Sequence, residues 1–166
     1  MILIIVGVDC SGKDTLIEEL HKRTGYDVHR GSSFNLTHGK SQDELFESFM
    51  SFTKMNNIIL NRYYMCNHVY APLYNDYAQI REEDMRFIER ELQGDALVIH
   101  LYADEDVIKL RFKTRGEDYV DECKIKTILE SYDKFVEECE LDVLSFDTGI
   151  KTSTEIADII MDHISY

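Results

Sequence analysis

The stretch Ile4–Ile17, IIVGVDCSGKDTLI, joins the end of a strand, a glycine-rich loop and the start of a helix. The continuous apolar run over residues 2–6 is typical of a strand that is buried on both faces of a parallel sheet. Gly7 and Lys13 then frame the pattern G-x-x-x-x-G-K, in which backbone N–H groups surround nucleotide phosphates. Because a helix follows directly, its positive dipole end adds to the attraction for an anion. We therefore predict a phosphate-binding loop over residues 7–13.

The position after the lysine departs from the usual form of this loop. A serine or threonine that helps to hold magnesium normally stands where this chain has Asp14. A carboxylate can also ligate Mg²⁺, directly or through water, and Thr15 keeps a hydroxyl close to the anion. The loop is still expected to bind a triphosphate, with ATP and Mg²⁺ as the cofactors. The expected ATP-binding residues are Gly7, Cys10, Ser11, Gly12, Lys13, Asp14 and Thr15.

Beyond the loop, short apolar runs alternate with helical patterns, which predicts a three-layer α/β fold around a parallel five-stranded sheet. The single proline, Pro72, marks no boundary, and no repeat or linker appears, so residues 1–166 are expected to form one domain. Thr152 and Glu155 form a possible capping box for the last helix. The expected strands cover residues 2–6, 26–30, 57–60, 96–101 and 141–146, and the expected helices cover 13–24, a segment from about 42, around 85–92, 104–115, around 125–136, and a segment after Thr152 through Ile160.

Composition and charge restrict the class of partner. The net charge of −14 argues against a general nucleic-acid binder, since the phosphate backbone would be repelled, but allows a small anionic ligand in a locally basic pocket. The apolar run at the N-terminus is too short for a membrane span and lacks a leader's basic residues and cleavage site. The cysteines are scattered and suggest a reducing compartment. We expect a cytoplasmic protein that binds small-molecule nucleotides, neither nucleic acid nor membrane.

The predicted strand ends gather charged and polar residues. In an open parallel sheet, ligands bind outside the carboxyl ends of the strands. Two arginines there, near Lys13, can clamp a second anionic group bidentately, as a substrate with its own phosphate would require. Each arginine alone also fits an ordinary surface position. The residues at these ends are Asp9, Arg30, Asn61, Arg62, Asp104 and Asp147.

The segment ILNRYYMCNHVYAPLY, residues 59–74, resembles thymidylate kinases. That family has Asp-Arg-Tyr or Asp-Arg-His after the third strand, then a serine three residues after the aromatic residue and a tyrosine four further on. The resemblance implies that Arg62 holds the acceptor phosphate and the phosphate being transferred, and that Tyr70 lines the acceptor pocket. The matching positions here are Asn61, Arg62, Tyr63, Cys66 and Tyr70.

The same resemblance extends to the first two strand ends. It implies that Asp9 binds the 3′-hydroxyl of the sugar, which favours a deoxynucleotide, and that Arg30, in HRGSSF, is another acceptor-phosphate arginine. Asn61 replaces the family's aspartate and supplies no charge. Our hypothesis is that Asp14 offsets that loss, with both residues near the magnesium. No equivalent of the family's base-reading arginine is found, because Lys54 is the only cation near its place, so the base stays open.

Arg111 and Arg115 are four residues apart and therefore share a helix face. Residues 111–121 resemble the lid of nucleoside monophosphate kinases, whose arginines close over the transferring phosphate and stabilise its charge. The alternative is that the two arginines pair with Glu117, Asp118 or Asp121.

Taken together, the residues predict a P-loop kinase of the nucleoside monophosphate kinase type. The expected reaction moves the γ-phosphate of ATP to dTMP or another deoxypyrimidine monophosphate, with Lys13, Arg62, Arg111 and Arg115 as catalytic residues. Two alternatives stay open: another acceptor, such as a nucleoside, a small alcohol or a modified DNA base, and a non-catalytic nucleotide binder. A GTPase-like switch is disfavoured, because D-x-x-G and N-K-x-D are absent. The family resemblance also implies a possible homodimer.

Overall fold

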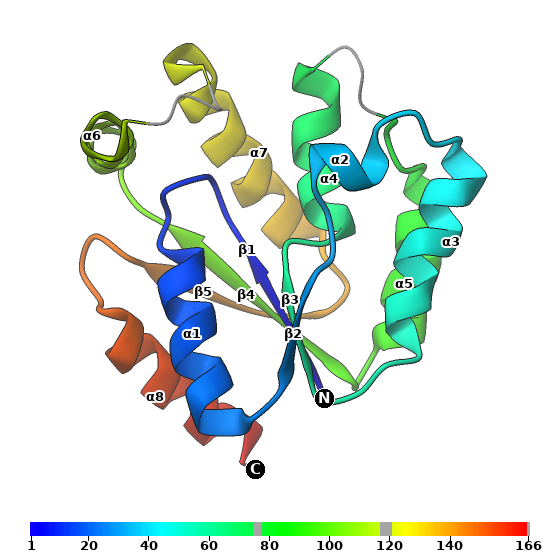
Figure 1. Cartoon of the computed structure of the whole chain (residues 1–166), viewed down its shortest axis with the longest axis horizontal. Coiled ribbons are helices and arrows are strands. Elements are labelled where there is room, and N and C mark those ends of the chain that lie inside the picture. The colour runs from blue at the N-terminus through cyan, green and yellow to red at the C-terminus, as the bar shows by residue number, and fades with distance from the viewer. Residues whose placement is uncertain (75–77, 117–120, 166) are drawn as a thin grey trace.

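The computed structural model describes residues 1–74, 78–116 and 121–165, and within these residues five parallel strands form one sheet (Figure 1). The strand order is β2-β3-β1-β4-β5, so the central strand is the one that precedes the glycine-rich loop. The strands are β1 (Ile2–Val6), β2 (Asp27–Arg30), β3 (Ile58–Asn61), β4 (Ala96–Tyr102) and β5 (Asp142–Asp147). The predicted α/β fold with a five-stranded parallel sheet is confirmed.

Helices cover both faces of this sheet, in the three layers visible in Figure 1. Helices α1 and α8 lie on one face, and α3, α4, α5 and α7 lie on the other. The helices are α1 (Lys13–Thr24), α2 (Phe34–Thr37), α3 (Gln42–Thr53), α4 (Tyr64–Tyr70), α5 (Glu82–Leu92), α6 (Glu105–Arg115), α7 (Ile125–Glu138) and α8 (Ser153–Ile164), with single 3₁₀ turns at Ala71–Leu73 and Glu122–Lys124.

Alternate residues of the central strand belong to different cores. Leu3 and Ile5 pack with the apolar faces of α1 and α8, whereas Ile2, Ile4 and Val6 pack with the larger layer. Successive side chains of a strand point to opposite faces, so a strand between two helical layers must be apolar throughout. This explains the uninterrupted apolar run at residues 2–6.

The predicted helix ends are also found. The side chain of Thr152 accepts a hydrogen bond from the N–H of Glu155, and the Glu155 carboxylate accepts one from the N–H of Thr152, so the capping box is present. Gly25 ends α1 and Gly116 ends α6 in the left-handed conformation that glycine adopts readily. Helices α2 and α4 were not among the predicted elements.

All five strands run in the same direction, so their carboxyl ends meet at one edge of the sheet, where the glycine-rich loop lies. Lys54, which ends α3, precedes the opposite end of β3 and is not among the residues at this edge. Among the described helices, none is both long enough and apolar enough to cross a bilayer.

Candidate active site

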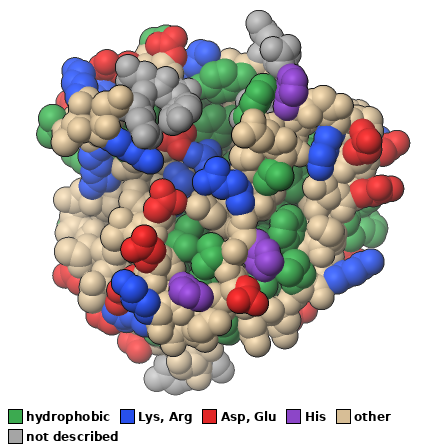
Figure 2. Space-filling model, viewed as in Figure 1, with side chains coloured by type: hydrophobic (Ala, Val, Ile, Leu, Met, Phe, Trp, Pro, Cys, Tyr) green, Lys and Arg blue, Asp and Glu red, His purple; other side chains and the backbone are tan. Residues whose placement is uncertain are grey.

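A cleft of about 980 Å³ opens at the carboxyl edge of the sheet, and Figure 2 shows Lys and Arg side chains gathered around the hollow in the upper part of the molecule. Nearly all of the predicted site residues line this cleft, although they come from five separate segments of the chain. Gly7 and Ser11 are buried and are not among its lining residues. The predicted residues on the wall are Asp9, Cys10, Gly12, Lys13, Asp14, Thr15, Arg30, Asn61, Arg62, Tyr70, Arg111 and Arg115.

The glycine-rich loop curls around the side chain of its own lysine. Lys13 Nζ donates hydrogen bonds to the carbonyl oxygens of Gly7, at 2.9 Å, and Val8, at 2.7 Å. Burial, and then the nearby charge of Arg62, lower the pKa of Lys13 to about 8. The ammonium group is therefore held among neutral carbonyls at the site where a phosphate would be a stronger partner.

Gly7 allows the loop to pass close to the neighbouring strand. Its φ is +143°, and a Cβ there would lie 2.1 Å from the carbonyl oxygen of Leu101 and 2.9 Å from Ser11 Oγ. Ser11 Oγ is buried and has no hydrogen-bond partner among the described residues. An unsatisfied buried hydroxyl is unfavourable, so this conformation of the loop carries a local energetic cost.

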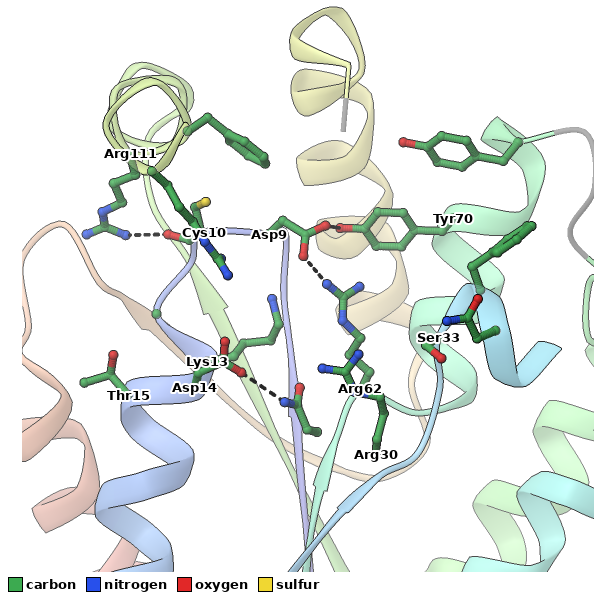
Figure 3. A pocket seen from close by; sticks show the side chains of 17 residues that line it. Asp9, Cys10, Lys13, Asp14, Thr15, Arg30, Ser33, Arg62, Tyr70 and Arg111 are labelled. Carbon is green, nitrogen blue, oxygen red and sulfur yellow. Dashed lines mark hydrogen bonds and ion pairs between the residues drawn. The ribbon is translucent and has the colours of Figure 1, made fainter. Parts of the chain in front are cut away.

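Across the cleft, Arg62, Asp9 and Tyr70 form one cluster (Figure 3). Arg62 forms an ion pair with Asp9, Tyr70 donates a hydrogen bond to Asp9 Oδ2 at 3.2 Å, and the Arg62 guanidinium lies 5.5 Å from the centre of the Tyr70 ring. Burial raises the pKa of Asp9, but Arg62 and Lys13 outweigh it, and the net pKa is lowered. Asp9 is therefore an ionised carboxylate at neutral pH.

Asp14 and Asn61 lie side by side on the same wall. Asn61 Nδ2 donates a hydrogen bond to Asp14 Oδ1 at 3.0 Å, drawn as a dashed line in Figure 3. The parallel register of β1 and β3 pairs Asn61 with Ile5, which brings the end of β3 next to the loop and the first turn of α1. Asp14, which replaces the usual serine or threonine of the loop, and Asn61, which replaces the aspartate of thymidylate kinases, are therefore in direct contact.

Arg111 connects α6 to the glycine-rich loop and to the segment after β5. Its Nη1 donates to the Cys10 carbonyl at 3.2 Å and to Thr148 Oγ1 at 2.9 Å, and its Nη2 donates to the Thr148 carbonyl at 2.7 Å. A second cleft of about 380 Å³ adjoins this contact. It is lined by Cys10, Gly12, Thr15, Arg111, Thr148, Gly149, Ile150, Lys151, Thr152 and Ser153.

Arg115 also lines the main cleft, four residues after Arg111 on α6. Among the described residues, Arg111 is held by carbonyl and hydroxyl oxygens and by no carboxylate. Of the alternative partners, Glu117 and Asp118 lie outside the described residues, as do all of residues 117–120 of the predicted lid at 111–121. The closure of these arginines over a phosphate stays a prediction.

Two of the residues predicted at the strand ends, Asp104 and Asp147, are not among the described lining residues of the cleft. Asp147 Oδ1 instead accepts a hydrogen bond from the N–H of Gly149 at 2.7 Å.

Several described residues of the cleft wall were not predicted from the sequence to belong to the site. Tyr74 both packs against the core and lines the cleft. The other lining residues that were not predicted are Ser33, Phe34, Asn35 and Phe112.

The donor set of the cleft fits Mg²⁺. In the described parts of the chain, no three His, Cys, Asp or Glu side chains gather into a metal cage. Magnesium usually keeps several waters and is bound by one or two carboxylates together with substrate phosphates. A carboxylate, an amide and a hydroxyl beside a phosphate loop, from Asp14, Asn61 and Thr15, match that preference.

The fold of this chain is similar to that of P-loop kinases of known structure. A deoxyadenosine kinase from M. mycoides with bound dATP has a TM-score of 0.66 at 18% identity, with 100% of both chains covered. The thymidylate kinase from Candida albicans has a TM-score of 0.63 at 16% identity, with 99% of this chain and 90% of that chain covered. At these identities the likeness shows the fold alone.

The chain belongs to the same family as the SPbeta prophage-derived uncharacterized protein YorR of Bacillus subtilis strain 168, to which it is 38% identical over 160 residues, 96% of each chain. A crystal structure of YorR in complex with phosphorylated GDP has a TM-score of 0.94 at 36% identity, with 99% of this chain and 96% of that chain covered. No family model matches the sequence. The predicted kinase fold is thus confirmed, whereas membership of the thymidylate kinases is not.

Proposed function

We propose that this protein transfers the γ-phosphate of ATP to the phosphate of a nucleoside monophosphate. The observation that carries the proposal is the presence of two cationic centres in one cleft. Lys13 lies in the phosphate loop, and Arg62 and Arg30 line the same cleft from the ends of β3 and β2. Phosphoryl transfer brings together two anionic groups, a triphosphate and an acceptor phosphate. The cleft offers one cationic centre for each of them.

The carboxylates of the cleft favour a phosphorylated acceptor over an alcohol. An alcohol needs a general base within reach, whereas a phosphate is already nucleophilic. Among the described lining residues, the carboxylates are Asp9 and Asp14. Asp9 is paired with Arg62 and has a lowered pKa, so it is a weak base, and Asp14 lies on the side of the phosphate loop.

In this proposal, catalysis depends on positioning and on neutralising charge. Lys13 leaves the carbonyls of its own loop to bind the triphosphate, and Arg62 binds the acceptor phosphate while it keeps its ion pair with Asp9. Asp9 then accepts a hydrogen bond from the acceptor's sugar, with Tyr70 beside it. Arg111 and Arg115 supply positive charge from α6. Bound Mg²⁺, next to Asp14 and Asn61, would neutralise charge on the phosphates.

Two kinds of nucleotide are the first candidates for the acceptor. The resemblance of residues 59–74 to thymidylate kinases favours dTMP or another deoxypyrimidine monophosphate. The complex of YorR with phosphorylated GDP makes a guanine nucleotide the second candidate. The wall near Arg30 carries the side chains of Ser33, Phe34 and Asn35, which combine an aromatic ring with a hydroxyl and an amide, groups suited to contacting a base.

The test is an ADP-release assay with ATP and Mg²⁺ against dTMP, dUMP, dCMP, dGMP, GMP, dAMP, thymidine and deoxyguanosine. We expect turnover with one or a few monophosphates, lost in Lys13→Ala and Arg62→Ala. Lys22→Ala, at an exposed position on α1, is the matched control and should keep full activity. Turnover only with the nucleosides would contradict a phosphate acceptor. Nucleotide binding without turnover on any acceptor would instead indicate a non-catalytic binder.

A further inference from the structure

The contact between Asp14 and Asn61 leaves each side chain with an oxygen that faces no partner. Among the described residues, Asp14 Oδ2 accepts no hydrogen bond, and neither does the amide oxygen of Asn61. Both residues line the cleft next to Lys13, and the Asp14 side chain is exposed to it. Two free oxygens, from a carboxylate and an amide, are ligands that suit a hydrated Mg²⁺.

The charges at these positions are exchanged relative to an ordinary P-loop site. There, a neutral hydroxyl on the loop and a carboxylate from another strand hold the metal. Here, the position after the lysine carries the carboxylate, and the end of β3 carries the neutral amide. The two positions together still contribute one negative charge.

The geometry explains why only one of the two is charged. A second carboxylate at position 61 would lie about 3 Å from the first, and such a pair cannot ionise fully without a cation between them. The first turn of α1 is also the better place for the charge, because the helix dipole and Lys13 both favour an anion there.

We propose that the metal-site charge of this protein is transposed, so that Asp14 carries the carboxylate that holds Mg²⁺ or its water shell, and Asn61 orients the carboxylate and the waters as a neutral partner. The inference rests on the proposed function, because it requires a bound nucleotide whose phosphates complete the coordination. The negative charge that a strand end normally supplies to the metal then comes from Asp14 in the first turn of α1.

The opposing explanation is that Asp14 only stabilises the start of α1. An acidic residue in the first turn of a helix does so wherever it lies on that turn. The two explanations differ in their effect on metal binding, which is measured without any acceptor and without turnover.

The experiment measures Mn²⁺ binding by electron paramagnetic resonance in the presence of ADP, together with the affinity for ADP with and without Mg²⁺ by calorimetry. Mn²⁺ suits the same oxygen ligands as Mg²⁺. The variants are Asp14→Asn, Asn61→Asp, and the double variant that moves the charge back to position 61. Glu18→Gln is the matched control, since it removes one exposed carboxylate from α1, one turn further on.

We expect Asp14→Asn to weaken Mn²⁺ binding about tenfold or more and to abolish the gain in ADP affinity that Mg²⁺ brings, with metal-free ADP affinity unchanged. The double variant should recover most of that loss, and Glu18→Gln should stay within about threefold of the wild type. Asn61→Asp alone should bind Mn²⁺ at least as tightly as the wild type, because its two neighbouring carboxylates are stabilised by a cation between them. Equal metal affinity in Asp14→Asn and Glu18→Gln would overturn the proposal, as would a double variant no better than Asp14→Asn.

The readouts separate this inference from the proposed function. If wild-type protein binds no ADP, with or without metal, both are overturned. If ADP binds and Asp14→Asn leaves the metal dependence intact, only the transposed charge is wrong. Metal-free ADP affinity in every variant also verifies that each is folded.

Discussion

The guanidinium of Arg62 forms an ion pair with the carboxylate of Asp9, joining the end of β3 to the loop after β1. The side chains are only 20% and 23% exposed, and Arg62 has a left-handed backbone with φ of +67°. A non-glycine residue in that region is strained, and such strain persists only where surrounding contacts hold it. The ion pair thus supports both the charge and the backbone at the centre of the cleft.

We predict that Arg62→Ala lowers the free energy of unfolding by roughly 1–3 kcal/mol, because it leaves the Asp9 carboxylate largely buried without its partner. Asp9→Ala combined with Arg62→Ala should be less destabilising than the sum of the single variants. Urea unfolding measures each value. Arg30→Ala, an exposed arginine of the same cleft, should change stability by no more than about 0.5 kcal/mol. Additive effects of the two single variants would contradict the coupling.

Nucleotide affinity should fall as the pH rises above about 8, the pKa of Lys13 in the free protein. A phosphate binds the protonated ammonium, so binding at higher pH must take up a proton. Calorimetry in buffers of different ionisation enthalpy measures the protons that are taken up when the nucleotide binds. The uptake linked to Lys13 should be almost zero at about pH 6.5 and close to one proton at about pH 9. Affinity that stays constant across this range would show that the ammonium does not contact the phosphates.

The lowered pKa of Lys13 also affects stability, but in the opposite direction: nucleotide affinity falls as the pH rises, whereas the free energy of unfolding increases. Lys13 has its ordinary pKa of 10.5 in the unfolded chain and about 8 in the folded one. Between these values the unfolded chain binds more protons, so the contribution of Lys13 to stability rises with pH and is least favourable below 8. A Lys13→Met variant should lose this part of the pH dependence.

Gly31→Ala should reduce turnover strongly. A Cβ at Gly31 would lie 2.3 Å from the Arg62 carbonyl oxygen, so β2 and the end of β3 must separate and Arg62 must move. Gly94→Ala is a control of a different kind, because Gly94 has a φ of +83° with no heavy atom near a Cβ. It should cost about 1 kcal/mol of stability through backbone strain and leave turnover unchanged. Equal turnover in the two variants would contradict the close-contact explanation.

Arg111→Lys should weaken ADP binding about tenfold, since a lysine cannot reproduce the three hydrogen bonds to Cys10 and Thr148. Thr148→Val removes the hydroxyl that accepts from Arg111 and donates to the Tyr102 carbonyl oxygen, and it should weaken binding less, by about fivefold. Thr148→Ser keeps the hydroxyl and serves as the control. Calorimetric affinities measure all three, and wild-type affinity in Arg111→Lys would show that the contact does not shape the loop.

The parts of the fold that local patterns encode were predicted well. Strand β1, the glycine-rich loop and α1 follow one another without interruption, and the capping box at Thr152 involves residues three positions apart. Helix α4 was missed for a physical reason. Six of its seven residues are buried, so it shows no amphipathic period from which a helix could be recognised.

The site was predictable where it lies at strand ends, and less so where it depends on distant contacts. The rule that ligands bind at the carboxyl ends of parallel strands identified Arg30 and Arg62. The hydrogen bond from Arg111 to Cys10 joins residues 101 positions apart, and only the packed structure shows it. The wall at residues 33–35 is the N-cap and the start of a four-residue helix, which is too short to produce a periodic signal.

Helix α1 connects the phosphate loop to α8 through its packing. It begins at the phosphate loop, and its Leu16 and Leu20 share the smaller of the two cores with Ile156 and Ile160 of α8. Arg23 near its end also pairs with Asp158 of α8 at 2.5 Å. We therefore expect a ligand that stabilises α1 to reduce local opening of α8 as well, which would slow amide hydrogen exchange there. The C-terminal helix thus becomes a remote reporter of whether the cleft is occupied.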